Sequence, residues 1–349
     1  MRIRKILNLL LREAGIGLAL AVLLIVFSIM APRFGSGANF TNILVQISIN
    51  TVISVGMTFA ILLGGIDLSV GSVLALATVV AGKVITDESL SVPGAIVLAV
   101  LASMGVGMAC GLFNGWVSER WKIHTFIVTL GMLNIARGAA LQVSHSRTIF
   151  AFPEAFNEFG SKPVLRYGEF QVPVIFLIAA VAVLAGRFVL ARTVFGRLIY
   201  AIGNNEEAVR LSGHNPSRYK VAAFTLTGAT VGLAAIMYMM RLNISSPILG
   251  VGFELNAIAA VVIGGTSMSG GKGSMVGTFL GACIMGVLNN GLVLLGMGDF
   301  ARQMVTGFII VLAVIVDKYR ARAVAALTAF EPVHVEPSPA APLPPVPRA

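Results

Sequence analysis

The sequence predicts an all-α membrane protein, a polytopic bundle of about ten transmembrane helices, some of them broken at glycines. Hydrophobic residues make up 57% of the 349 residues and charged residues only 11%, against about 25% charged residues in ordinary soluble domains. The chain also contains a series of apolar runs of about 16–20 residues, each long enough to cross most of a hydrocarbon core roughly 30 Å thick. Its basic residues fall mainly between these runs.

A basic segment at residues 1–14 precedes a membrane domain at residues 15–317. The first apolar run resembles a signal peptide, but no small-x-small cleavage site is clear before Pro32, so we interpret it as an uncleaved span, with a removed signal as the alternative. In order, spans are expected near residues 15–31, 43–63, 68–86, 92–117, 123–142, 171–190, 220–240, 252–266, 275–297 and 300–317.

The distribution of Lys and Arg predicts that both termini are cytoplasmic. With ten spans in this orientation, 17 of the 25 basic residues lie inside and six outside, and Arg137 and Arg302 fall within spans. Cytoplasmic loops carry the excess of Lys and Arg in membrane proteins. The net charge of +10 therefore reflects topology, and nucleic-acid binding is not indicated.

The most informative stretch is the junction between the second and third spans. Gly64, Gly65 and Gly71 allow the backbone to bend there, and Ser69 can form local hydrogen bonds. Asp67 is the only charged residue between Arg33 and Lys83. A carboxylate at mid-bilayer costs about 2.5–3.5 kcal/mol, so we expect a wet or protein-lined break here, either between two spans or within a re-entrant segment. Alternatively, Asp67 is a plain N-cap of the third span.

A faint internal repeat lies at an offset of 200 residues. Residues 60–65 (AILLGG) correspond to residues 260–265 (AVVIGG), and a serine and a glycine follow at matching positions. Duplicated halves that meet at glycine breaks are common in transporters. Gly264 and Gly265 are therefore further candidates for a break in the translocation pathway, and the predicted topology makes the repeat parallel.

The loop at residues 191–219, on the predicted cytoplasmic side, contains a short helix. Asn204 or Asn205 can cap its start, and acidic residues in the first turn suit the positive end of the helix dipole. Gly213 can take the left-handed position after its end. Such a short helix is not stable alone, so we expect it to dock into a partner.

Two other segments lie outside the spans. The loop at residues 143–170, placed outside the cell, mixes charges with aromatic residues, which are either interfacial anchors or a docking surface for a partner. Residues 318–349 form a cytoplasmic tail in which residues 331–349 hold seven of the fourteen prolines, so we expect disorder there.

Together these residues resemble the ribose-type permeases, the membrane subunits of bacterial sugar ABC importers. The resemblance covers about residues 40–317, in order and at the family's spacing. It rests on residues 64–72 (GGIDLSVGS), 114–115 (NG), 124–132 (HTFIVTLGM), 137–138 (RG), 200–205 (YAIGNN), 208–213 (AVRLSG), 262–267 (VIGGTS) and 270–271 (GG).

The resemblance implies that residues 205–213 form the coupling helix that sits in a groove of a separate ATPase subunit. The residues it assigns to coupling are Asn205, Glu206, Glu207, Ala208, Arg210 and Gly213; the second alanine of the family's loop pattern is Val209 here. It further implies a second permease copy, giving a homodimer in the lipid bilayer. A periplasmic sugar-binding protein would dock on residues 143–170 and 241–252.

Enzyme activity is not indicated, because the chain has no Walker A string and no catalytic Ser/His/Asp or paired-carboxylate set. Cys110 and Cys283 lie in apolar runs without metal-ligand spacing, so no metal or cofactor is expected on this subunit and ATP is used by its partner. Two alternatives remain: a branched-chain amino-acid permease of the same superfamily, and an ion-coupled carrier that uses Asp67, Arg137 and Glu254.

Overall fold

A computed structural model describes residues 2–329 as a bundle of helices with one small β-hairpin. Most of the predicted proline-rich tail, residues 330–349, lies outside the described residues. The elements in chain order are α1 (Arg2–Met30), α2 (Gly37–Leu62), α3 (Val70–Ile85), α4 (Val92–Trp121), α5 (Thr125–Ser144), α6 (Glu154–Ser161), β1 (Pro163–Tyr167), β2 (Phe170–Pro173), α7 (Val174–Arg192), α8 (Val194–Asn204), α9 (Glu206–Leu211), α10 (Pro216–Leu242), α11 (Phe253–Ile263), α12 (Met275–Leu294) and α13 (Asp299–Ala329).

The structure confirms an all-α, multi-pass membrane protein. Among the described helices, six are long and apolar enough to cross a membrane: α2, α4, α5, α7, α10 and α12. Shorter apolar helices are formed by Ala14–Met30 of α1, by α3 and by α11. All ten segments expected from the sequence coincide with a helix, and α13 continues past the expected end of the last span to Ala329.

The core is built around α2, which packs against α7, α10, α11 and α12. Its side chains Val52, Ile53 and Met57 are completely buried. Small residues bring the helix backbones together: a Cβ at Gly107 of α4 would lie 2.1 Å from the carbonyl oxygen of Gly228 of α10. Close contact between glycine faces is a usual way to associate helices in lipid.

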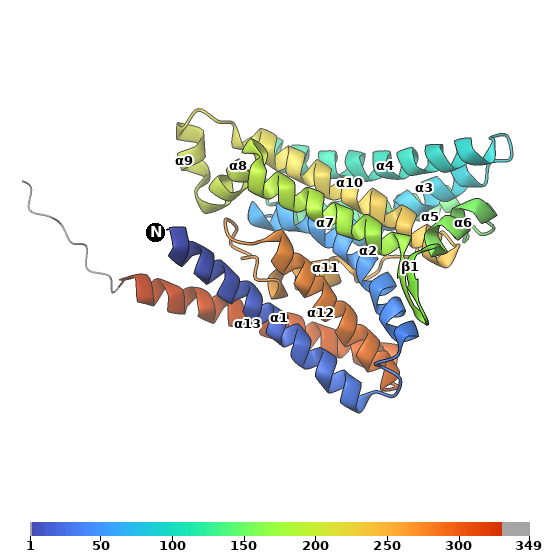
Figure 1. The fold of residues 1–349 in the computed structure, drawn as a ribbon. Helices are drawn as coiled ribbons and strands as arrows, with labels where there is room; N and C mark the ends of the chain where they lie inside the picture. The colour runs from blue at the N-terminus through green and yellow to red at the C-terminus, as the bar shows by residue number, and fades with distance from the viewer. Residues whose placement is uncertain (1, 330–349) are drawn as a thin grey trace, which may run out of the picture.

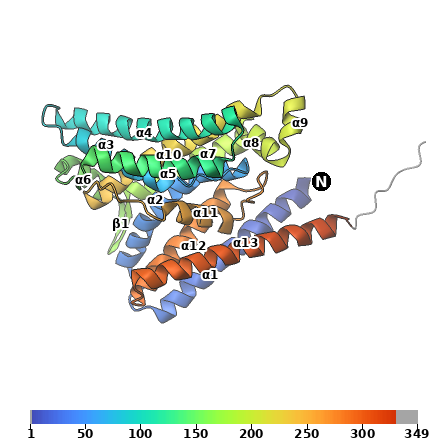
Figure 2. The same cartoon turned by 180° about the vertical axis from the view of Figure 1, so that it is seen from behind.

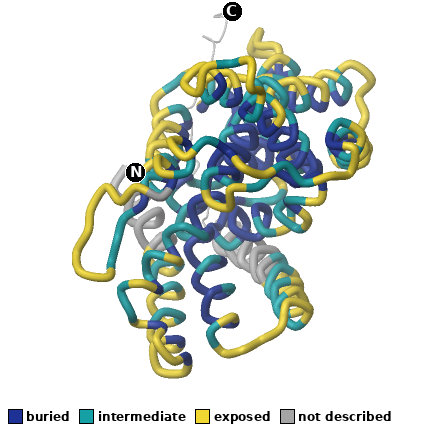
Figure 3. Tube along the Cα trace, turned by 90° about the vertical axis from the view of Figure 1, so that its right-hand side faces the viewer, coloured by how far each residue is buried: buried dark blue, intermediate teal, exposed yellow. Residues whose placement is uncertain are grey.

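Apolar side chains also cover much of the outside of the bundle. Figure 3 shows buried residues in the interior and exposed residues around the rim. On α4, α5 and α7 the exposed side chains include Leu101, Ile135 and Val181. An apolar outer surface of this kind is what a lipid environment requires.

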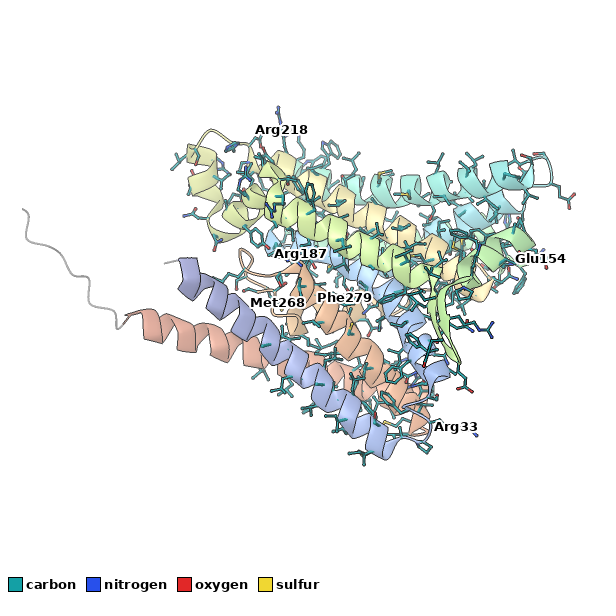
Figure 4. The ribbon with its side chains drawn as sticks, viewed as in Figure 1. Arg33, Glu154, Arg187, Arg218, Met268 and Phe279 are labelled. Atoms are coloured by element: carbon teal, nitrogen blue, oxygen red, sulfur yellow. The ribbon has the colours of Figure 1, made fainter. Side chains whose placement is uncertain are left out.

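The two ends of the bundle differ in what they carry. Helices α8 and α9 lie at the same end as the start of α1 and the end of α13, whereas α6 and the hairpin lie at the other end (Figures 1 and 2). Figure 4 places Arg218 at the α9 end and Glu154 at the α6 end. The start of α1 and the end of α13 therefore lie at the same end of the bundle.

The segment between α5 and α7 is more ordered than a plain loop. It contains α6 and the antiparallel hairpin of β1 and β2, neither of which the sequence analysis predicted. Phe152 and Phe156 are buried against α10, whereas Phe150, Phe159 and Tyr167 are exposed. Expecting interfacial anchors was therefore wrong for the two buried phenylalanines, because they pack into the bundle as core side chains.

Candidate functional site

The first helix break follows directly from the glycines after α2. Gly64 adopts a left-handed conformation with φ +77°. The amide of Gly65 then donates to the carbonyl oxygen of Ala60 at 3.0 Å, and that of Gly64 to Ile61 at 2.8 Å. This geometry ends a helix and pairs its last carbonyl groups.

Asp67 is almost completely buried within this break, at 2% exposure. Its carboxylate accepts hydrogen bonds from the amide of Ser69 at 2.9 Å and from the hydroxyl of Ser69 at 2.6 Å. The side-chain amide of Asn114 on α4 donates to the same hydroxyl at 3.0 Å. Asp67 is therefore not the N-cap of α3, because Ser69 occupies that position. Asp67 instead closes a turn that precedes the helix, through its hydrogen bonds to Ser69.

Two other parts of the bundle hold the first break in place. The hydroxyl of Thr125 accepts from the amide of Ile66 at 3.3 Å, and the hydroxyl of Thr129 donates to the carbonyl oxygen of Ile66 at 3.2 Å. Gly71 faces the unwound segment before α11, where an added Cβ would lie 2.1 Å from the carbonyl oxygen of Gly250. The break is thus lined by protein, as the buried carboxylate required.

The second break, between α11 and α12, has the same end geometry. Gly265 takes φ +79°, and the amide of Thr266 donates back to the carbonyl oxygen of Val261 at 3.1 Å. Gly265 is thus the counterpart of Gly64, so the two breaks align at an offset of 201 positions (265 − 64), and Gly264 occupies the place of Leu63. The repeat seen in the sequence is real in backbone conformation but shifted by one residue.

The two breaks meet each other and the end of α8. The amide of Gly271 donates to the carbonyl oxygen of Leu62 at 2.8 Å. The side chain of Asn204 donates to the carbonyl oxygen of Gly271 at 3.1 Å. A Cβ at Gly203 would lie 1.9 Å from the carbonyl oxygen of Leu62. We name these four residues, Leu62, Gly203, Asn204 and Gly271, the break junction.

The short helix α9 follows the junction directly and has the predicted caps. Asn205 is its N-cap and accepts from the amide of Ala208 at 3.0 Å. Glu206 and Glu207 occupy its first turn, and Gly213 adopts φ +84° after its end. Local capping chemistry therefore predicted this element correctly.

One face of α9 packs inward and the other is open. Val209 is buried against Leu198 and Ile202 of α8. Leu211 is 81% exposed, and Ala208 is also exposed. Arg210 pairs with Glu207 at 3.0 Å and with Glu206 at 3.4 Å within the helix. Leu211, Ala208 and the charged residues therefore form the outer side of α9, which the rest of the described chain leaves uncovered.

An ion-pair cluster ties α9 to two long helices. The ammonium of Lys220 on α10 lies 2.6 Å from Glu206 and 3.0 Å from Glu119 of α4. Glu119 also receives the ammonium of Lys122 at 2.8 Å and the hydroxyl of Ser217 at 2.6 Å. The cluster thus links α9 directly to α4 and α10.

A cavity of about 430 Å³ lies between the first break and α9. Its lining includes Gly64, Gly65, Glu119, Glu207, Lys220 and Phe224. Of the residues predicted from the sequence, the cavity brings together Gly64 and Gly65 of the first break with Glu206, Glu207 and Arg210 of α9. The other predicted break and coupling residues do not line it.

The remaining intramembrane charges do not join Asp67. Arg137 donates to the carbonyl oxygens of Pro247 and Leu249, the latter at 2.8 Å, and so holds the unwound segment before α11. Glu254 accepts from the amide of Gly252 at 3.2 Å. Within residues 2–329 no three His, Cys, Asp or Glu side chains are grouped as metal ligands.

Two parts of this site were missed by the sequence analysis. Helix α8 was interpreted as loop, although apolar residues such as Leu198, Ile199 and Ile202 recur on the face that it buries. This helical spacing of apolar residues could have predicted α8 from the sequence. The pairing of Glu119 with Lys220 joins residues distant in the chain and left no local pattern.

Comparisons with known proteins agree with this geometry. The family described as "Branched-chain amino acid transport system / permease component" matches residues 39–314. The chain is 41% identical over 301 residues to the ribose import permease protein RbsC of Escherichia coli (strain K12), covering 86% of this chain and 92% of that protein.

Relatives with other names align over similar lengths. The L-arabinose ABC transporter permease protein AraH of Azospirillum brasilense is 34% identical over 311 residues, covering 89% of each chain. The fructose import permease protein FrcC of Rhizobium meliloti is 36% identical over 308 residues, covering 86% of this chain and 84% of that protein. No solved structure matches. The chain therefore belongs to the family of ribose-type ABC-transporter permeases.

Proposed function

We propose that this protein is the membrane-spanning permease subunit of a bacterial ABC importer for a simple sugar of the ribose, pentose or hexose class. Its relatives are named for the import or transport of ribose, arabinose, allose and fructose, which favours a sugar over a branched-chain amino acid. A separate ATPase subunit supplies the energy, and a periplasmic binding protein delivers the sugar.

The observation that carries this proposal is the attachment of α9 to the two breaks through α8. The amide of Gly271 joins the two breaks through its 2.8 Å bond to Leu62, and the 3.1 Å bond from Asn204 to Gly271 holds the end of α8 against them. The next residues form the exposed helix α9, with Leu211 uncovered. In this proposal the ATPase grips Asn205, Glu206, Glu207, Ala208, Arg210 and Gly213. Closure of the ATPase then moves Gly64, Gly65, Asp67, Ser69, Gly71, Gly264 and Gly265, which border the pathway.

The topology that fits this role has ten spans in the inner membrane, with the α9 end in the cytoplasm. Both termini and the proline-rich tail are then cytoplasmic. The periplasmic surface consists of residues 143–170 with residues 241–252, which are linked by a backbone bridge between Ile149 and Ser245. A second copy of the permease completes the pathway, and lipid surrounds the dimer.

The proposal is tested in proteoliposomes that hold this protein with its ATPase and its binding protein. We expect ATP-dependent sugar uptake, and we expect Glu207→Ala to reduce it strongly because Glu207 lies on the exposed side of α9. Glu88→Ala is the matched control, since Glu88 is an exposed glutamate in the turn between α3 and α4, far along the chain from α9.

Three results would contradict the proposal. Uptake by the permease alone, independent of ATP and of Glu207, would favour the ion-coupled carrier. Uptake of leucine or valine without sugar uptake would favour the branched-chain alternative. An equal loss in Glu88→Ala and Glu207→Ala would remove the coupling role of α9.

A further inference from the structure

A second polar site lies in the other half of the bundle. A cavity of about 170 Å³ is enclosed by α2, α10, α11 and α12. It lies next to the last turn of α10 and the first turn of α11, and these helix ends point toward the end of the molecule that carries α6 and the hairpin (Figure 1). It is therefore separate from the break junction and, in the proposed topology, lies in the outer half of the membrane.

The lining of this cavity is rich in side-chain amides. Its polar and aromatic residues, which we name the amide pocket, are Gln46, Asn50, Tyr238, Arg241, Phe253, Asn256 and Asn289. The rings of Tyr238 and Phe253 lie 5.9 Å apart, centre to centre, and are tilted by 57°. No carboxylate lines the cavity.

The amides of this pocket are available to a ligand. Within the described residues, the side chains of Gln46, Asn50 and Asn256 form no hydrogen bond with protein, although all three are half-buried. Asn289 donates to the carbonyl oxygen of Met285 at 3.0 Å and keeps its own oxygen free of that bond. Polar side chains within membrane spans are costly and mark substrate pathways.

We propose that the amide pocket is a binding subsite for a neutral sugar on its way through the permease. Each amide offers both a donor and an acceptor, which suits neighbouring hydroxyl groups, and Arg241 and Tyr238 add donors. Ring faces such as those of Tyr238 and Phe253 offer an apolar surface to the C–H groups of a sugar. Amide groups that bind hydroxyls, together with ring faces that contact C–H groups, are the features expected of a site for a polyhydroxylated ligand.

The lining carries no negative charge. A cationic group that leaves water is stabilised by a paired carboxylate, so a neutral hydroxylated ligand suits this lining better than a cation does. The cavity of about 170 Å³ is also smaller than the roughly 300–1,000 Å³ typical of sites for drug-sized ligands, so it fits one small molecule.

This inference rests on the proposed function and adds a place where the sugar is held. Since the pocket lies on the outer side of the break junction, sugar released by the binding protein reaches it first. The contact is weak, because the binding protein provides the affinity and the sugar must leave again.

The test compares Asn256→Ala with wild type in the complete transporter, reconstituted with ATPase and binding protein. Uptake of ribose and of its deoxy analogues is measured together with ATP hydrolysis in the same liposomes. Loss of one hydrogen bond corresponds to a decrease in uptake of about three- to tenfold, and we expect ATP hydrolysis to remain. We also expect the preference for ribose over one deoxy analogue to shrink.

The control is Asn134→Ala on α5, an exposed asparagine of another apolar helix that does not line the cavity. It should behave as wild type. If Asn256→Ala does not assemble, Asn50→Ser is measured in the same way.

The inference is overturned if uptake and sugar preference stay unchanged, or if uptake and ATP hydrolysis fall together with the preference unchanged, which would mean a structural role. If the wild-type transporter takes up no sugar at all, the proposed function fails, and this outcome is distinct from an unaffected variant.

Discussion

At the scale of single residues, the same local motif occurs in two environments. Asp67 and Ser69 form a buried turn, whereas Asp87 and Ser89 form a nearly identical turn in the exposed connection between α3 and α4, with hydroxyl–carboxylate distances of 2.6 and 2.7 Å. Only the buried serine also receives a hydrogen bond from Asn114. Comparing the two turns therefore measures how much the buried hydrogen bonds of Ser69 contribute to the stability of the protein.

We predict that Ser69→Ala destabilises the purified protein and that Ser89→Ala does not. Removing the Ser69 hydroxyl leaves the buried amide of Asn114 without that partner, and a lost partner for a buried polar group costs about 1–3 kcal/mol. The measurement is the thermal unfolding midpoint in detergent. Equal midpoints for the two variants would show that the hydrogen bonds around Asp67 do not support the break.

At the scale of elements, local signals were readable and contacts between distant segments were not. The predicted spans match helices because long apolar runs are a local property. The caps of α9 were also predictable, since a cap depends on a few neighbouring residues. Nothing local could show that Gly271 pairs with Leu62, or that Lys220 joins Glu206 to Glu119, because these contacts exist only after folding.

Helix α8 provides the test at this scale. We predict that Gly203→Ala strongly reduces sugar uptake and lowers stability. The added Cβ would lie 1.9 Å from the carbonyl oxygen of Leu62 and would push the end of α8 away from Leu62 and Gly271. Gly138→Ala on α5 is the control, since a Cβ there meets no atom within 4 Å. Alanine is favoured over glycine in helices by about 1 kcal/mol, so the control should be neutral or slightly stabilising.

Uptake is measured in the reconstituted transporter and stability by thermal unfolding. Wild-type uptake in a well-folded Gly203→Ala variant would mean that the close contact between α8 and Leu62 is not needed for transport. The coupling route through α8 would then be excluded.

At the scale of the whole molecule, the two ends of the bundle carry different elements. Helices α8 and α9, the start of α1 and the end of α13 occupy one end, and α6 with the hairpin occupies the other (Figures 1 and 2). An excess of Lys and Arg marks the cytoplasmic side. The sequence predicts that most basic residues lie on the cytoplasmic side, which stays a prediction, whereas the fold shows that the end of α8 contacts both breaks.

We predict that a cysteine at Ala208 in α9 reacts with a membrane-impermeant thiol reagent only in inside-out vesicles. A cysteine at Glu88 should react only in right-side-out vesicles. Both positions are exposed, whereas the natural Cys283 is buried and Cys110 is half-buried. The readout is labelling of the purified protein by mass shift, and the reverse pattern would invert the proposed topology.

The pairing of the two breaks has a consequence for motion. A helix that ends within a membrane leaves carbonyl groups that no water can satisfy. Here the connection between α11 and α12 supplies a missing partner for the end of α2, since the amide of Gly271 meets the carbonyl oxygen of Leu62. Pulling the two apart would leave both groups without this partner. We therefore expect this point to act as a fulcrum: the segments on either side swing during each transport cycle, while the crossing itself keeps its bonds.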